Sequence, residues 1–141
     1  MGLLNKAKKY TAKELEKKLD KVFSHYIRLR AADDLGYVQC VTCGNRHNWK
    51  EVHCGHYMPR TRKAVRFNEM NCQVQCVKCN YRRSGEHDLF REYLLEKYGK
   101  EEVEKLERLA KLGGSDDAYS LQFKIDEYKE KVKQLKKEKG L

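Results

Sequence analysis

Two Cys-x-x-Cys pairs constrain the fold of this chain more than any other feature. The first pair is Cys40 and Cys43, the second is Cys76 and Cys79, and 32 residues lie between them. Each pair fits a tight turn that aims both sulfurs at one point, and two such turns complete a tetrahedral zinc site. Four thiolates close such a site, so it stabilises the fold and leaves no position for catalysis. We therefore expect a structural Zn²⁺ and look for chemistry elsewhere.

The composition predicts a small intracellular chain with a modest core. Its 141 residues are 40% hydrophobic and 37% charged, which suits one compact domain with helical extensions. Metal binding adds to the stability of so small a core. Residues 1–10 hold no apolar run of signal-peptide length, and no segment approaches the ~20 apolar residues that cross a membrane. We expect a cytoplasmic protein whose cysteines bind metal rather than form disulfides.

The charge predicts a polyanionic partner, with nucleic acid first. Thirty-one basic residues against 21 acidic ones give a net charge of +10, although a solvated lysine-rich surface is the plainer alternative. The excess is local, because Glu69 is the only acid between residues 60 and 83. Arg66 either contacts phosphate or pairs with Glu69. The predicted phosphate contacts are the basic residues Arg60, Arg62, Lys63, Arg66, Arg82 and Arg83.

Apolar periodicity predicts helices on both sides of the cysteine pairs. Thr11 and Glu14 form a capping box for a helix that runs to about Ala32. Further helices are expected over 86–98 and 101–112, and a last one ends near Lys139. The last helix carries a heptad seam that pairs either with a second copy or with the N-terminal helix of the same chain. The seam consists of Leu121, Ile125, Tyr128, Val132 and Leu135.

Between the helices, two strands and a short helix are expected to form the centre. The strands fall within 49–57 and near 72–75, and the helix begins near Asn80. The predicted fold class is α+β, mostly helical, with a small zinc-stabilised ββα core between N- and C-terminal helices. The predicted parts are a helical arm over 1–35, a nuclease core over 36–98 and a second helical arm over 99–141. The last helix of the second arm is a possible dimerisation helix.

Two residues at the centre have the chemistry of phosphodiester hydrolysis. His56 lies near the end of a predicted strand and, as a neutral imidazole, suits a general base. Asn80 follows the fourth cysteine directly, so a zinc turn would hold it rigidly, and its amide oxygen is a hard ligand suited to Mg²⁺. A base and a cation at one phosphate are the parts that such hydrolysis needs.

The order Cys40, Cys43, His56, Cys76, Cys79, Asn80 resembles the zinc-bearing, endonuclease VII-like form of the His-Me finger (HNH) nucleases. More narrowly, about residues 25–130 resemble the NinG (Rap) family of phage lambda recombination nucleases. That resemblance implies a phage-encoded endonuclease that cuts D-loops and Holliday junctions. It also implies that His56 is the base, that Asn80 binds Mg²⁺ or Mn²⁺, and that the four cysteines bind zinc. The matching segments are Gly55-His56-Tyr57, Arg66-Phe67-Asn68-Glu69, Asn71, Gln75-Cys76, Cys79-Asn80 and Ser84-Gly85.

The chain departs from the HNH pattern directly before His56. Many relatives carry an aspartate there as a metal ligand, whereas this chain has Gly55. NinG proteins carry an acid three residues before the histidine, and here that residue is His53. We expect His53 either to bind the catalytic metal, where imidazole suits Mn²⁺ or a transition metal at least as well as Mg²⁺, or to be a partly exposed strand histidine. Cys54 and Cys72 are either small buried residues or, with His53, a second metal site.

The sequence therefore favours a metal-dependent, structure-selective DNA endonuclease that recognises the backbone and the shape of a branch. One alternative is a zinc-stabilised DNA-binding module without catalysis. Another is a site-specific or nonspecific HNH nicking enzyme. The expected partners are branched DNA, recombination proteins and a second copy of the chain, because a symmetric junction needs two cuts.

Overall fold

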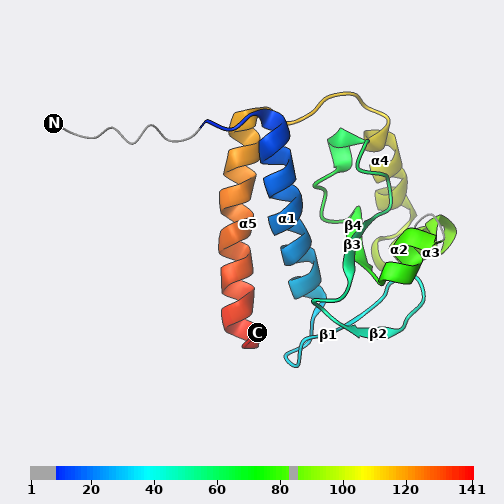
Figure 1. Cartoon of the computed structure of the whole chain (residues 1–141). Coiled ribbons are helices and arrows are strands. Elements are labelled where there is room, and N and C mark those ends of the chain that lie inside the picture. Colours follow the sequence, from blue (N-terminus) through cyan, green and yellow to red (C-terminus); the bar gives the residue numbers. More distant parts are fainter. Residues whose placement is uncertain (1–8, 83–85) are drawn as a thin grey trace.

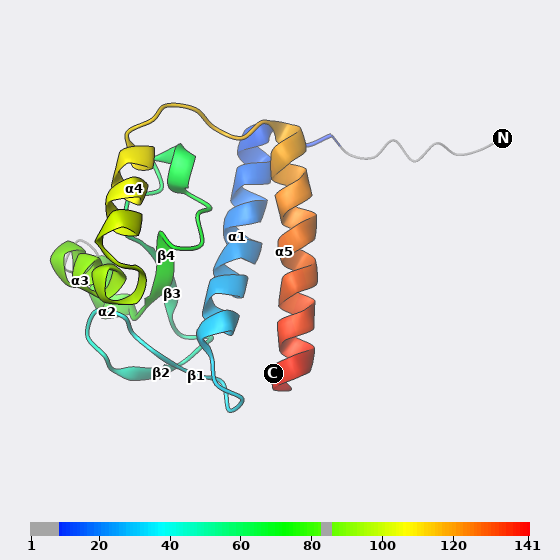
Figure 2. The same cartoon turned by 180° about the vertical axis from the view of Figure 1, so that it is seen from behind.

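The computed structural model describes residues 9–82 and 86–141, and two long helices form one side of it. They are α1, Ala12–Ala31, and α5, Ala118–Lys139. They lie side by side in both views (Figures 1 and 2). Each begins at a cap that the sequence supplies. Thr11 accepts a hydrogen bond from the backbone of Glu14, and Asp117 accepts one from that of Ser120.

The heptad seam of α5 packs against α1 within the same chain. Four of its five residues are buried, and Leu135 packs against the same core, which also holds Leu19, Phe23 and Ile27 of α1. Of the two arrangements that the sequence left open, the intrachain one is therefore observed. The dimerisation role predicted for this helix stays a prediction. A dimer that used it would have to separate α5 from α1.

A hairpin that the sequence did not reveal carries the first cysteine pair. Strands β1, Tyr37–Gln39, and β2, Arg46–Asn48, pair antiparallel, and Cys40 and Cys43 lie in their connection. The strands have three residues each, too few to show the alternation by which strands are recognised.

A second antiparallel hairpin, followed by a short helix, forms the centre of the molecule. Strand β3, His53–His56, pairs with β4, Cys72–Gln75, so that His53 faces Gln75 and His56 faces Cys72. The long connection includes the 3-10 turn η1, Lys63–Val65. Helix α2, Val77–Arg82, follows β4 and begins before Asn80, where the sequence placed its start. The predicted strand–strand–helix order is thus observed, with β3 shorter than expected.

Two further helices close the side away from α5 (Figure 1). Helices α3, His87–Tyr98, and α4, Lys100–Ala110, meet at Gly99 and bury a second apolar cluster around Phe90, Leu94 and Val65. Both lie close to where the sequence predicted them. Across residues 9–82 and 86–141, no helix has the length and apolar character needed to span a membrane.

Candidate active site and zinc centre

The four cysteines of the two Cys-x-x-Cys pairs come together in one knuckle. Their sulfurs all lie within 4.8 Å of one another. The Cys76 backbone N–H donates to Cys40 Sγ at 3.3 Å, and Cys43 Sγ lies 3.8 Å from Cys76 Sγ. Four thiolates from two turns are the donor set of a structural Zn²⁺ site. The chemistry of these residues fits the zinc that the sequence predicts.

The thiols of this knuckle differ in how readily they ionise. Burial raises the pKa of the Cys40 thiol, but hydrogen bonds from Thr42 and from the backbone of Cys43 and Cys76 bring that pKa down to about 6. Burial raises the pKa of Cys79 to about 12. A divalent cation among the sulfurs would offset the cost of a buried thiolate at Cys79.

His56 and Asn80 line the same cleft, which has a volume of about 600 Å³. α1 forms one wall with Asp20, Ser24 and Arg28, while β3 and α2 form the other with His53, Cys54 and Tyr81. The two residues that the sequence singled out for catalysis therefore face one space, although 24 positions separate them in the chain.

His56 has the environment of a neutral base. Its Nε2 lies 3.0 Å from the backbone carbonyl oxygen of Arg66. A carbonyl only accepts, so Nε2 carries the hydrogen and Nδ1 keeps the lone pair. Burial lowers the pKa of His56, and the opposing effects of the Arg66 carbonyl and Asp20 do not reverse that direction. The ring is therefore neutral at pH 7, as a general base requires.

Arg66 is occupied by two carboxylates of α1. Its Nε donates to Asp20 at 3.0 Å and its Nη1 to Glu16 at 3.0 Å, and Nη2 also bonds Asp20. Its side chain is only 12% exposed. The alternative pairing of Arg66 with Glu69 is wrong, because α1 supplies the partners. A guanidinium already neutralised in this way has little charge left for phosphate, and its carbonyl is what reaches His56.

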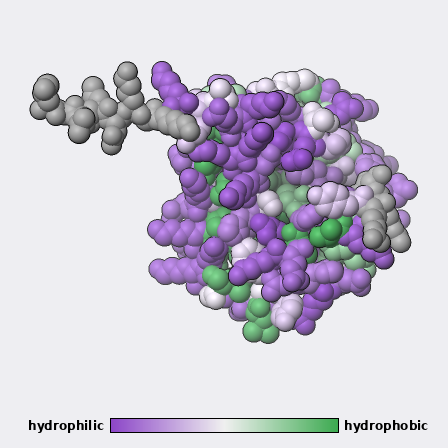
Figure 3. All heavy atoms as spheres, in the orientation of Figure 1, coloured by the Kyte–Doolittle hydropathy of each residue, from purple (hydrophilic) through white to green (hydrophobic). Residues whose placement is uncertain are grey.

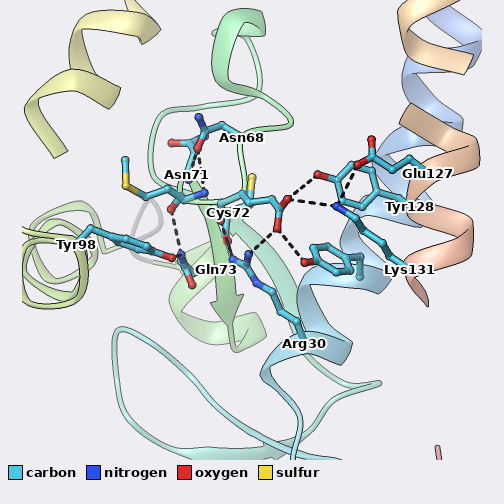
Figure 4. A network of polar contacts seen from close by, with 12 residues as sticks. Arg30, Asn68, Asn71, Cys72, Gln73, Tyr98, Glu127, Tyr128 and Lys131 are labelled. Carbon is cyan, nitrogen blue, oxygen red and sulfur yellow. Dashed lines mark hydrogen bonds and ion pairs between the residues drawn. The ribbon is translucent and has the colours of Figure 1, made fainter. Parts of the chain in front are cut away.

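Glu69 joins the loop before β4 to both long helices. Its carboxylate accepts from Tyr26 at 2.9 Å, Arg30 at 3.3 Å and Tyr128 at 3.0 Å, and Lys131 lies 3.8 Å away. Arg30 also donates to the backbone oxygens of Glu69 and Cys72. Figure 4 shows Arg30, Tyr128 and Lys131 converging from α1 and α5. This network holds the segment that presents the Arg66 carbonyl.

Asn80 and His53 meet in the same cleft as His56. Asn80 Nδ2 lies 3.0 Å from His53 Nδ1, and the ring of Tyr81 packs edge-on against that of His53 with centroids 5.2 Å apart. An amide oxygen and an imidazole nitrogen are donors that suit Mn²⁺ or another transition metal at least as well as Mg²⁺. The pairing is compatible with the predicted metal-binding role of His53, which stays a prediction.

Gly55 leaves room for the side chain of Gln75. A Cβ atom at position 55 would lie 2.0 Å from Gln75 Oε1 and 2.7 Å from its Cδ. Gln75 is fully buried and donates to Thr42, so it has no free space to move into. The side chain of Gln75, on the opposite strand, thus occupies the space that an aspartate side chain at position 55 would need. This explains why residue 55 is glycine.

The predicted phosphate contacts are scattered around the cleft rather than gathered in it. Arg60 lines the cleft and is 62% exposed, with Asp20 at 3.7 Å. Lys63 is 50% exposed and pairs with Glu16 at 3.5 Å, while Arg62 lies in a separate hollow beside α4. The Arg82 side chain and Arg83 lie outside the described residues. Hydrophilic residues cover most of the face in Figure 3.

A second group of possible metal ligands surrounds His56. Ligand atoms of Cys54, His56 and Cys72 all lie within 4.8 Å of one another. One of the two alternatives from the sequence grouped these cysteines with His53, whereas the structure brings them together with His56, because residues 54 and 56 share a face of β3. Cys72 is fully buried, as expected for a small apolar residue, but Cys54 lines the cleft.

Comparison with known proteins gives a consistent family. Residues 4–138 match the family model described as "Bacteriophage Lambda NinG protein". Protein ninG of Escherichia phage lambda is 34% identical over 94 residues, which is 64% of this chain and 43% of that protein. Protein ninG of Escherichia phage 933W and that of Salmonella phage P22 are each 33% identical over the same shares. The match thus spans less than half the length of these relatives, and no solved structure matches.

Proposed function

Because the chain belongs to the NinG family of phage proteins, we propose that it is a metal-dependent DNA endonuclease selective for branched structures such as D-loops and Holliday junctions. The observation that carries the proposal is the cleft that His56 and Asn80 share. A module that only binds DNA has no use for a half-buried, neutral imidazole opposite a carboxamide.

The catalytic roles follow from the atoms that are free. His56 Nε2 is fixed on the Arg66 carbonyl, so Nδ1 takes a proton from water as that water attacks phosphorus. Asn80 and His53 meet in the same cleft, and a divalent cation held by them would stabilise charge on the phosphate and the leaving oxygen. The knuckle fixes the start of α2, and thereby the position of Asn80. Arg60 at the rim contacts the DNA backbone.

The fit of the cation donors is partial, which favours a second candidate. Neither Asn80 nor His53 supplies a carboxylate, and the carboxylate of Asp20, which lines the cleft, is engaged by Arg66 and Arg60. A site without a free carboxylate binds Mg²⁺ weakly. A zinc-stabilised DNA-binding module is therefore the alternative, and a nicking enzyme without branch preference is the third possibility.

The test compares four-way junctions, flaps and linear duplexes with Mg²⁺ or Mn²⁺. We expect the junction to be cut fastest, and His56→Ala to lower the rate by about 10² to 10⁴, the usual effect of losing a general base. His87→Phe is the matched control, because His87 stacks on Tyr57 with centroids 4.6 Å apart and the phenyl ring preserves that contact.

Each other outcome selects another function. Equal nicking of all substrates would indicate an enzyme without branch selectivity. Tight binding of the junction with no cleavage under either metal would leave the DNA-binding module. Full activity of His56→Ala would contradict the assignment of the base even if the protein is a nuclease.

A further inference from the structure

Beside the proposed base lies a ligand set with the wrong chemistry for Mg²⁺. His56 faces Cys72 across the hairpin, and Cys54 shares its face of β3, so all three ligand atoms lie within 4.8 Å of one another. We propose that Cys54, His56 and Cys72 bind a soft divalent cation of the Zn²⁺ class, and that its binding switches His56 off as a base. The metal site stands on this geometry alone, whereas the switching rests on the proposed function.

The metal-bound site would carry no net charge, which favours its formation inside the protein. Two thiols lose their protons to water as the cation binds, and two thiolates, a neutral imidazole and M²⁺ sum to zero. Cys72 is fully buried, and burial raises the pKa of its thiol well above the ordinary value. The isolated thiolate is therefore unfavourable there, and a cation on the sulfur removes that penalty. Thiolate ligands select Zn²⁺ and similar ions over Mg²⁺.

The cleft gives the cation access and an open position. Cys54 and His56 line it, so an ion reaches them from water. Asp20 lies in the same cleft but is held by Arg66, which leaves water as the fourth ligand. Three protein ligands with an open fourth position differ from the closed cysteine knuckle, which uses other sulfurs.

The His56 imidazole cannot be a metal ligand and a general base at the same time. One ring nitrogen of His56 donates to the Arg66 carbonyl, so one lone pair remains. A cation on that lone pair prevents the ring from accepting a proton from water. Soft cations should therefore inhibit cleavage at concentrations where Mg²⁺ or Mn²⁺ supports it.

Cobalt tests the site without reference to activity. Protein whose knuckle holds one Zn²⁺ is titrated with Co²⁺, and the thiolate-to-cobalt absorption band is followed. We expect the wild type to take up about one further Co²⁺ per chain with this band. Cys54→Ser and Cys72→Val should each weaken that step by at least about tenfold. Val74→Ala, which disturbs the same hairpin opposite Cys54 without removing a ligand, should keep it.

A measurement on the wild type alone covers the case in which a variant fails to fold. One further equivalent of Zn²⁺ should protect Cys54 from alkylation by N-ethylmaleimide, as read by peptide mass. No uptake of Co²⁺ by the zinc-loaded protein, an unchanged band in both cysteine variants, or unprotected Cys54 would overturn the site.

The two proposals fail separately. If Co²⁺ binds beside the Zn²⁺ of the knuckle but no DNA is cut, the site stands and the nuclease falls. If DNA is cut and Zn²⁺ inhibits the wild type and Cys54→Ser equally, the switching falls. If Zn²⁺ inhibits the wild type and Cys54→Ser is spared, both hold.

Discussion

At the scale of single residues, a backbone carbonyl fixes the proposed base, where many enzymes use a carboxylate. The Arg66 carbonyl selects the tautomer of His56 without adding a charge, so the pKa of the ring stays lowered by burial. A carboxylate in that place would favour the charged imidazolium. A neutral hydrogen-bond acceptor thus holds the His56 ring and leaves it able to accept a proton at pH 7.

Gly55 supports a prediction about packing next to this base. Gly55→Ala should lower the free energy of unfolding by about 1–3 kcal/mol, because its Cβ meets the buried Gln75 side chain. The measurement is urea unfolding at a fixed Zn²⁺ concentration. Gly113→Ala is the control, since a Cβ there has nothing within 4 Å, and it should change stability by less than about 0.5 kcal/mol.

A double-mutant cycle separates this clash from other causes. In a Gln75→Ala background the effect of Gly55→Ala should shrink by more than about 0.5 kcal/mol, because the two positions are in contact. Additive losses would show that Gln75 is not the reason for the glycine.

Which site residues the sequence could predict depends on how far apart their partners lie. The four cysteines sit in two local turns, so their spacing was sufficient, and the structure brings His56 and Asn80 to one cleft. The partners of Arg66 could not be found in this way. Glu16 and Asp20 lie on α1, about fifty positions away, and Glu69, three positions away, was the plausible choice.

At the scale of elements, the loop between β3 and β4 is tied to both long helices. Glu69→Ala should lower the free energy of unfolding by about 1–3 kcal/mol, because Tyr26 and Tyr128 lose their acceptor. It should also slow cleavage at a temperature where the protein is fully folded, since the loop carries the Arg66 carbonyl. Urea unfolding and junction cleavage measure the two effects.

Glu127→Ala is the control for that change. Glu127 also pairs with Lys131, at 3.1 Å, but this pair lies within α5, so Glu127→Ala should cost less than about 0.5 kcal/mol and leave cleavage unchanged. Equal losses in both variants would mean that Glu69 does no more than pair with a surface lysine.

Elements were predictable where their signals are local. Thr11 caps the start of α1, and Gly99 ends α3. Both signals act over one helical turn, and both helices are observed. The β1–β2 hairpin has strands of three residues, and its pairing depends on the cysteine turn between them rather than on an apolar pattern. Short strands held by a neighbouring turn carry no periodicity to detect.

At the scale of the whole molecule, the apolar seam of α5 packs against α1 of the same chain. Ile125 and Leu121 are buried against α1, so α5 completes the core instead of joining two copies. The unfolding midpoint of the wild type should therefore not change with protein concentration between about 1 and 100 µM, because a transition within one chain has no mass-action term. A dimer that serves a junction would have to use another surface.

Two substitutions on neighbouring faces of α5 test this arrangement. Ile125→Lys places an unpaired charge in the core and should cost about 3 kcal/mol or more at every concentration. Phe123 is 66% exposed, so Phe123→Lys should change stability by less than about 0.5 kcal/mol. A midpoint that rises with concentration in the wild type, and no longer does so in Ile125→Lys, would place the seam between two chains. The cleft wall that α1 forms with Asp20 would then depend on a partner subunit, and activity would be lost on dilution.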